Sequence, residues 1–146
     1  MERKEILKAI EEKYTKLGVP VDAMLEGLLH SSPITYWDYI QTDALLGLQT
    51  PRTNQPDEMV FIVYHQVNEL LFKMILWEID QVAKTNDVTP EKFSMHLDRI
   101  SRYFEMSCNS FDIMTEGMQR AQYLKFRNTL TPASGFQSAQ YRKIEF

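Results

Sequence analysis

Residues 56–80 carry the densest run of apolar side chains in the chain, PDEMVFIVYHQVNELLFKMILWEID. Apolar residues occupy most sides of the helix that this segment predicts, and such a helix is typical of the centre of a domain. Three polar residues share one face at i, i+3 and i+4, namely His65, Asn68 and Glu69, with Phe61 one turn before His65. Because a buried polar group is costly without a partner, we expect this stripe to be hydrogen-bonded and to mark the functional part of the helix.

The segments before this helix show shorter amphipathic patterns. Residues 2–17 present one apolar stripe, and Gly18, Val19 and Pro20 end it. A second short helix is expected near residues 22–29. Thr35 is the predicted N-cap of a helix over TYWDYIQTDALLGLQ, and Pro56 is expected in the first turn of the central helix.

The segments after the central helix are also helical in pattern. Thr89 and Pro90 predict the start of a helix that runs to about Met114 and returns antiparallel to the central one. Its apolar stripe is expected to consist of Phe93, Leu97, Ile100, Phe104 and Phe111. A short helix is predicted within residues 121–130, TPASG is a turn, and the chain is expected to resume as helix from Phe136.

No segment alternates with the period of two that a half-buried strand requires. The sequence therefore predicts an all-α fold, a helical bundle around one long buried central helix. Residues 1–34 are expected to form an N-terminal helical arm that covers its own domain or lies across another subunit. Residues 35–146 are expected to form the main helical domain.

Composition narrows the class of protein. The chain has 146 residues, of which 44% are hydrophobic, and a net charge of −4 with basic and acidic residues interspersed. This pattern argues against a nucleic-acid partner and against an anionic membrane surface. The single Cys108 excludes an internal disulfide framework, and the charged N-terminus has no signal-peptide core. Polar residues interrupt the longest apolar run, so we expect a core helix of a cytoplasmic protein and no membrane span.

Three features of the sequence suggest ligand chemistry. Tyr123 and Arg127 lie at i and i+4, and a guanidinium beside a phenol suits a small carboxylate; the alternative is a surface Arg next to a core Tyr. His65 is either a buried functional imidazole or a core histidine satisfied by its neighbours. TPASGFQS is either an anion-binding turn or only a turn.

The sequence lacks the motifs of several other kinds of active site. There is no Cys pair or His-x-x-x-His for zinc, no Glu-x-x-His pair of the kind used by di-iron bundles, and no nucleophilic Ser elbow. Cys108 has no basic neighbour in the sequence to activate it.

Three segments together resemble the tryptophan 2,3-dioxygenase family. They are TYWDYIQTDALLGLQ, PDEMVFIVYHQVNELLFKMILWEID and YLKFRNTLTPASGFQSAQYRKIEF, which follow one another in the family's order. The resemblance runs from about Thr35 to Phe146 and covers the front half of a family member. It implies a cytoplasmic, all-α, haem-dependent homotetramer that inserts both atoms of O2 across the indole 2,3-bond of L-tryptophan to give N-formylkynurenine.

The same resemblance implies roles for single residues. His65 would accept the indole N–H, and Phe61 would form a wall of the indole pocket. Arg127 would pair with the substrate carboxylate, and Tyr123 and Tyr141 would line the same pocket. The segment that reaches into a neighbouring subunit's site is matched by Tyr36, Tyr39 and Ile40.

The chain departs from the family pattern in two ways. Pro56 stands where family members often have His. The proximal haem-ligating histidine and the loop over the substrate ammonium belong to the family's C-terminal half, and neither His30 nor His96 has a matching context. We therefore expect no metal ligand in this chain, and activity only together with the missing half.

Two alternatives stay open. The chain could be a non-catalytic truncated homologue that acts through oligomerisation, or part of a haem dioxygenase for a related indole or aromatic amino acid.

Overall fold

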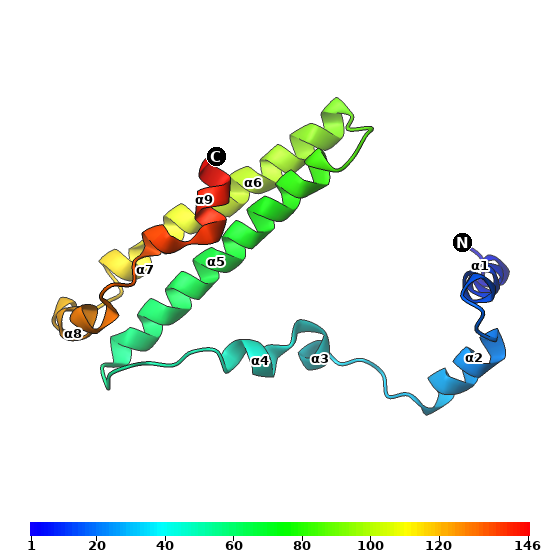
Figure 1. Cartoon of the computed structure of the whole chain (residues 1–146), viewed down its shortest axis with the longest axis horizontal. Coiled ribbons are helices and arrows are strands. Elements are labelled where there is room, and N and C mark those ends of the chain that lie inside the picture. The colour runs from blue at the N-terminus through cyan, green and yellow to red at the C-terminus, as the bar shows by residue number, and fades with distance from the viewer. The chain divides into compact units, whose positions relative to one another are not determined.

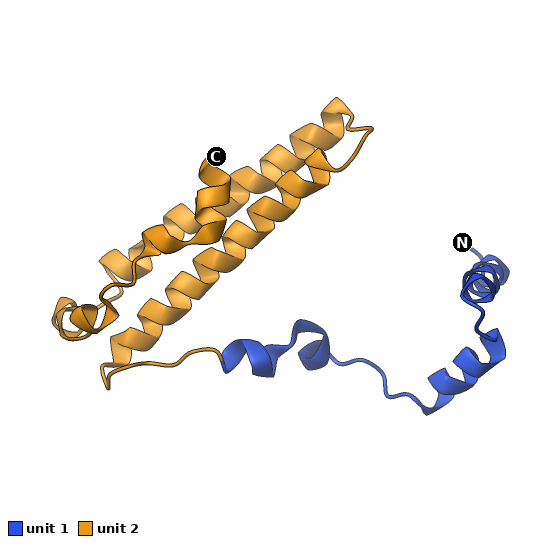
Figure 2. Ribbon diagram, in the orientation of Figure 1, with its two compact units in different colours: residues 1–47 blue, residues 48–146 orange.

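The computed structural model describes residues 1–146 as helices and loops without a strand (Figure 1). The all-α class predicted from the sequence is confirmed. The chain forms two compact units, residues 1–47 and residues 48–146 (Figure 2). The expected arm ended at residue 34, and the first unit extends to Gly47.

The first unit consists of four short helices, α1 (Arg3–Lys16), α2 (Val21–His30), α3 (Tyr36–Ile40) and α4 (Thr42–Leu46). Thr35 caps α3 as predicted, because its hydroxyl accepts a hydrogen bond from the Asp38 N–H at 3.2 Å. The prediction of one continuous helix over this segment is wrong. Gln41 has a φ of 57°, and this left-handed conformation ends α3 and separates it from α4.

The second unit is organised around α5 (Pro56–Ala83). Pro56 stands in its first turn, as predicted. The chain continues through α6 (Pro90–Ser110), α7 (Asp112–Thr115), α8 (Arg120–Phe126), the 3-10 turns η1 (Arg127–Leu130) and η2 (Gly135–Gln137), and α9 (Ala139–Glu145). The helices α6, α8 and α9 all pack against α5. The long central helix is thus confirmed as the scaffold of this unit.

Glu58 fastens the loop that leads into α5. Its side chain is 1% exposed and accepts hydrogen bonds from the Arg52 and Thr53 backbone N–H groups at 2.8 and 2.7 Å, and from the Thr53 hydroxyl. Burial raises the pKa of this carboxyl, but the three donors outweigh burial and hold the pKa below its ordinary value. The charge of Glu58 is therefore a structural part of the start of α5.

The helices α5 and α6 lie side by side and antiparallel (Figure 1). Asn68 accepts a hydrogen bond from Ser107 at 2.7 Å, and Glu78 contacts His96 at 2.6 Å. A later residue of α5 thus pairs with an earlier residue of α6, as in an antiparallel pair. The face of α6 toward α5 is thus largely polar. The expected apolar stripe of α6 is mostly exposed, including Phe93, Leu97, Phe104 and Phe111. The polar groups of α5 require donors, and those donors determine which side of α6 faces it.

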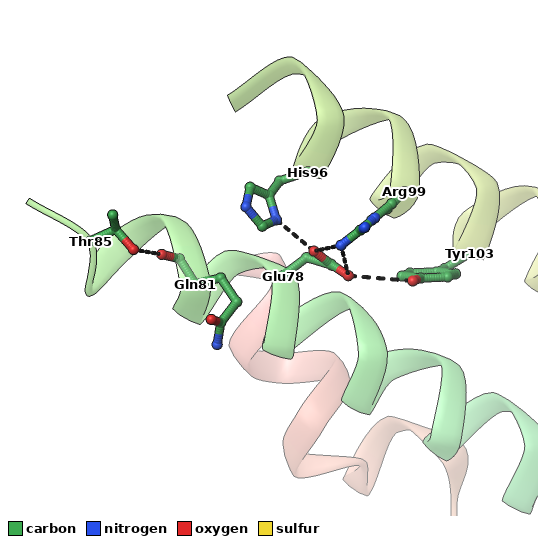
Figure 3. Close-up of polar contacts among 6 residues, drawn as sticks. All are labelled: Glu78, Gln81, Thr85, His96, Arg99 and Tyr103. Carbon is green, nitrogen blue, oxygen red and sulfur yellow. Dashed lines mark hydrogen bonds and ion pairs between the residues drawn. The ribbon is translucent and has the colours of Figure 1, made fainter. Parts of the chain in front are cut away.

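Glu78 is the centre of the polar contact between these helices (Figure 3). Its carboxylate is 5% exposed, pairs with the His96 ring nitrogen Nδ1 at 2.6 Å, and accepts from Arg99 and from the Tyr103 hydroxyl at 3.4 Å. Burial raises the pKa of Glu78, but the hydrogen bond from His96 and the charge of Arg99 outweigh it, so the pKa lies below its ordinary value. The folded state therefore favours the ionised carboxylate.

A pH-dependent stability follows from Glu78. A lowered folded-state pKa stabilises the protein above the unfolded pKa, and this contribution disappears as the pH falls through the folded-state pKa. We expect the free energy of unfolding, measured by urea titration, to fall as the pH drops from 6 to below the ordinary glutamate value of 4.5. The Glu78→Gln variant should have a lower free energy of unfolding at pH 6, and this free energy should fall less over the same pH range. Equal losses in both proteins would contradict the role of Glu78.

The sequence predicted that the central helix would be buried, and within this chain much of α5 is instead accessible. Among its residues only Glu58, Leu71, Ile75 and Glu78 are buried. A stripe of residues spaced three or four apart remains 37–64% exposed, and it consists of Met59, Val63, Val67, Leu70, Met74 and Trp77. Such spacing is typical of a seam for another helix. We call these six residues the α5 stripe.

By length and composition α5 could also cross a bilayer, since an 18-residue window has a mean hydropathy of 1.3. Soluble proteins contain core helices that meet the same two criteria. Along α5, Glu58, Glu69 and Glu78 are each hydrogen-bonded to other parts of the second unit.

Candidate functional site

A groove of about 890 Å³ opens in the second unit between α5, the end of α8 and the segment that follows it. Its volume lies in the range of small-molecule sites. Four residues singled out from the sequence line it together, namely Phe61, His65, Tyr123 and Arg127. The structure therefore brings two predicted groups, which lie about 60 positions apart in the sequence, to one place.

His65 lines this groove, and one of its ring nitrogens has a hydrogen-bond partner on its own helix. Its Nδ1 lies 2.7 Å from the Phe61 carbonyl oxygen. A carbonyl oxygen only accepts, so Nδ1 carries a proton, and in the uncharged tautomer Nε2 is then an acceptor. The Phe61 ring lies 4.2 Å from the imidazole, centroid to centroid, and supports it from one side. His65 can therefore accept a hydrogen bond from an N–H group of a ligand.

The other two members of the polar stripe have structural partners. Asn68 donates to the Tyr64 carbonyl at 3.0 Å and accepts from Ser107 of α6. Glu69 accepts from the Gln140 side chain at 2.8 Å, which ties α9 to α5. The expectation that the stripe would be hydrogen-bonded is confirmed. Asn68 and Glu69 link α5 to other helices, and His65 lines the groove.

On the side of α8, Tyr123 lines the groove and Phe126 packs against it. Phe126 is fully buried and packs edge-on against Phe61 and Tyr123, each with ring centroids 5.5 Å away. The Arg127 guanidinium lies 5.6 Å from the centre of the Tyr123 ring, a cation–π contact. Arg127 is exposed and has no carboxylate partner within the chain. Its forked donors are therefore available to an anion at the edge of the groove.

Tyr141 lines a second, smaller hollow of about 320 Å³ and lies 5.5 Å from the Phe72 ring. His65, Tyr64 and the segment 134–136 border both hollows. Tyr141 therefore adjoins the groove and does not line it. Tyr64 lines both hollows and was not predicted from the sequence. Of the segment TPASGFQS, which the sequence left open between a turn and an anion site, Ser134, Gly135 and Phe136 line both hollows.

Tyr36, Tyr39 and Ile40 belong to the first unit and line neither hollow. They are 65%, 75% and 42% exposed. Their expected role at the site of a neighbouring subunit stays a prediction.

Comparison with known sequences identifies the family. The family model described as tryptophan 2,3-dioxygenase matches residues 25–146. The chain belongs to the tryptophan 2,3-dioxygenase family. It is 43% identical over 115 residues to the tryptophan 2,3-dioxygenase of Ruegeria sp. (strain TM1040), a match that covers 77% of this chain and 40% of that protein.

Two further relatives agree with this membership. The tryptophan 2,3-dioxygenase of Herpetosiphon aurantiacus is 43% identical over 121 residues, which covers 80% of this chain and 45% of the relative. The tryptophan 2,3-dioxygenase of Bradyrhizobium sp. (strain BTAi1) is 40% identical over 135 residues, which covers 88% and 47%. The chain thus spans less than half the length of these curated relatives. The resemblance noted from the three sequence segments is confirmed.

Proposed function

We propose that this chain forms the substrate-binding side of a haem-dependent tryptophan 2,3-dioxygenase, which oxidises L-tryptophan with O2 to N-formylkynurenine, the first step of the kynurenine pathway. The observation that carries the proposal is the joint position of His65, Phe61, Tyr123 and Arg127 around one groove. Family membership supports the same reaction class.

Each of these residues has a separate task in binding. Nε2 of His65 accepts the indole N–H, because Nδ1 is already bonded to the Phe61 carbonyl. The rings of Phe61 and Tyr123 enclose the flat indole and exclude water from it. Arg127 binds the carboxylate through paired N–H donors. A zwitterionic amino acid with an apolar ring requires this combination of an aromatic wall, one acceptor and one carboxylate clamp.

The residues present fit one side of a haem. The aromatic groove with His65 on one wall would hold the substrate next to the haem. In this proposal the other two histidines would not supply the haem ligand, because His96 is engaged by Glu78 and His30 ends α2 of the first unit. We place that ligand in the part of the family sequence that this chain does not span. When bound, haem supplies the iron chemistry that activates O2, and this chain positions the substrate.

The test is the visible absorption spectrum of the purified chain with added haemin. We expect no stoichiometric Soret band from the chain alone. A stoichiometric band and formation of N-formylkynurenine should arise when the remaining part of the Ruegeria relative is added. Haem binding and activity without that part would show that the axial ligand lies in this chain. A complemented protein that binds haem and leaves tryptophan unchanged would contradict the proposed reaction.

A second candidate is a non-catalytic homologue that acts through oligomerisation, and the exposed α5 stripe favours it, since large exposed apolar surfaces mark association sites. The two candidates predict different outcomes in light scattering combined with activity assays. An oligomer that never oxidises tryptophan, even when complemented, would support the second. The family's arrangement as a cytoplasmic homotetramer, with Tyr36, Tyr39 and Ile40 reaching a neighbouring subunit, is part of the first proposal.

A further inference from the structure

The two sides of the groove are joined by a ring of hydrogen bonds outside it. The Asp57 backbone N–H donates to the Gln122 side-chain oxygen at 3.0 Å, and the Asp57 carboxylate accepts from the Gln119 backbone N–H at 2.6 Å. The Gln122 amide nitrogen donates to the Gln119 side-chain oxygen at 3.1 Å and closes the ring. We call these three residues the α5–α8 clasp. It connects the first turn of α5 to the start of α8.

The helix α8 depends on such contacts. It has seven residues, and an isolated helix of this length is not stable in water. Phe126, fully buried at its last position, anchors one end. The clasp anchors the other end through a charge-assisted hydrogen bond, which is stronger than a bond between neutral groups. Together the two anchors fix both the position of α8 and its rotation about its axis.

The clasp also sets the geometry of the groove. On α5, Phe61 and His65 follow Asp57 by one and two turns. On the other side, Tyr123 follows Gln119 by one turn, and its ring lies 6.3 Å from that of Phe61. A shift at the clasp therefore changes the separation between the indole acceptor and the carboxylate clamp. Asp57 does not itself line the groove.

We infer that Asp57 is a positioning residue for substrate recognition: it holds α8 against α5, so that Tyr123 and Arg127 lie at the correct place for the tryptophan carboxylate. The inference rests on the proposed function, because it assigns Arg127 to that carboxylate. It gives Asp57 a role in distinguishing amino acids from the corresponding amides, which lack the carboxylate. This role adds to the favourable position of Asp57 at the positive end of α5.

The first experiment tests the clasp without any ligand. Hydrogen exchange of the amides of residues 119–126 is measured in the unaltered chain and in Asp57→Ala, Asp57→Asn and Asp80→Ala. Asp80 is the matched control, because it is an exposed carboxylate near the other end of α5 that pairs with Lys84. Asp57→Ala should exchange about tenfold faster in this segment. Asp57→Asn keeps an oxygen that accepts from the Gln119 N–H, so it should retain most of the protection.

The second experiment measures recognition. Dissociation constants for L-tryptophan and L-tryptophanamide are determined in the complemented, haem-loaded protein. The unaltered protein should prefer tryptophan because the amide lacks the carboxylate. Asp57→Ala should reduce the preference, defined as the dissociation constant for the amide divided by that for tryptophan, about tenfold. Asp57→Asn should restore most of it, and Asp80→Ala should leave it unchanged. A residue that only stabilised the fold would lower the melting temperature and leave this ratio unaltered.

The outcomes separate this inference from the function on which it rests. Unchanged exchange in Asp57→Ala would overturn the clasp. Faster exchange with an unchanged preference for tryptophan would overturn the role in recognition. An unaltered protein that shows no preference for tryptophan would overturn the proposed carboxylate site, and the exchange result would still decide whether the clasp holds α8.

Discussion

Replacing Arg127 by Ala in the complemented protein is expected to raise the KM for L-tryptophan about ten- to a hundredfold, since a hydrogen bond to a charged group contributes about 1.5–3 kcal/mol and each 1.4 kcal/mol is a factor of ten. Arg127 is placed by η1 at the edge of the groove, stacked on Tyr123 and without a carboxylate partner in the chain. Its loss removes a donor from the ligand and leaves the aromatic wall in place. Steady-state kinetics with L-tryptophan measures the effect.

Two variants make the Arg127 experiment specific. Arg120→Ala removes the same charge from the start of α8, away from the groove, and should leave KM unchanged. Arg127→Lys keeps the charge without the planar fork, so it should recover only part of the affinity. Normal kinetics in Arg127→Ala would refute the assignment of this residue to the carboxylate.

Replacing Phe126 by Ala is expected to lower the free energy of unfolding of the second unit by about 3–5 kcal/mol, the usual cost of removing a buried aromatic ring. Phe126 is 0% exposed and contacts the rings of Phe61 and Tyr123. Only Leu71 and Ile75 are comparably buried apolar residues in this chain, so the unit has few other contacts to compensate. Urea denaturation followed by circular dichroism measures the loss.

The matched control for this substitution is Phe136→Ala. Phe136 is 74% exposed, and truncating it should change the free energy of unfolding by less than about 0.5 kcal/mol. Phe126→Leu keeps most of the apolar volume and gives a folded protein for comparison if the Ala variant does not fold. Equal effects at both positions would show that Phe126 does not anchor α8.

The helices could be predicted from the sequence because their starts depend on residues that are close together in the chain. Thr35 and Thr89 carry capping hydroxyls, and both cap the helices that they were expected to cap. The break at Gln41 was not predictable, because glutamine has no marked preference for the left-handed conformation. The face that α6 turns to α5 was also missed. An apolar stripe predicts burial only when the partner is apolar, and here the partner presents Asn68 and Glu78.

In the candidate site, too, the local features could be predicted from the sequence and the contacts between distant segments could not. The spacing of Tyr123 and Arg127 predicts that they share a helical face, and the structure adds that this face meets Phe61 and His65. The tautomer of His65 depends on the Phe61 carbonyl, which no sequence pattern expresses. The clasp was likewise beyond sequence analysis, since Asp57 and Gln119 are 62 positions apart and two of the bonds use backbone N–H groups.

The antiparallel pairing of α5 and α6 has a consequence for the order of folding. Residues 84–89 are the only connection between them, so their contacts close short loops and form early. The groove is completed only when α8 and the following residues 127–136 dock, after many more residues have been ordered. We expect the groove to be the last part of the second unit to form and the first to open in thermal fluctuations. A bound ligand that contacts both α5 and α8 would then slow this opening, and binding would couple directly to the lifetime of the folded unit.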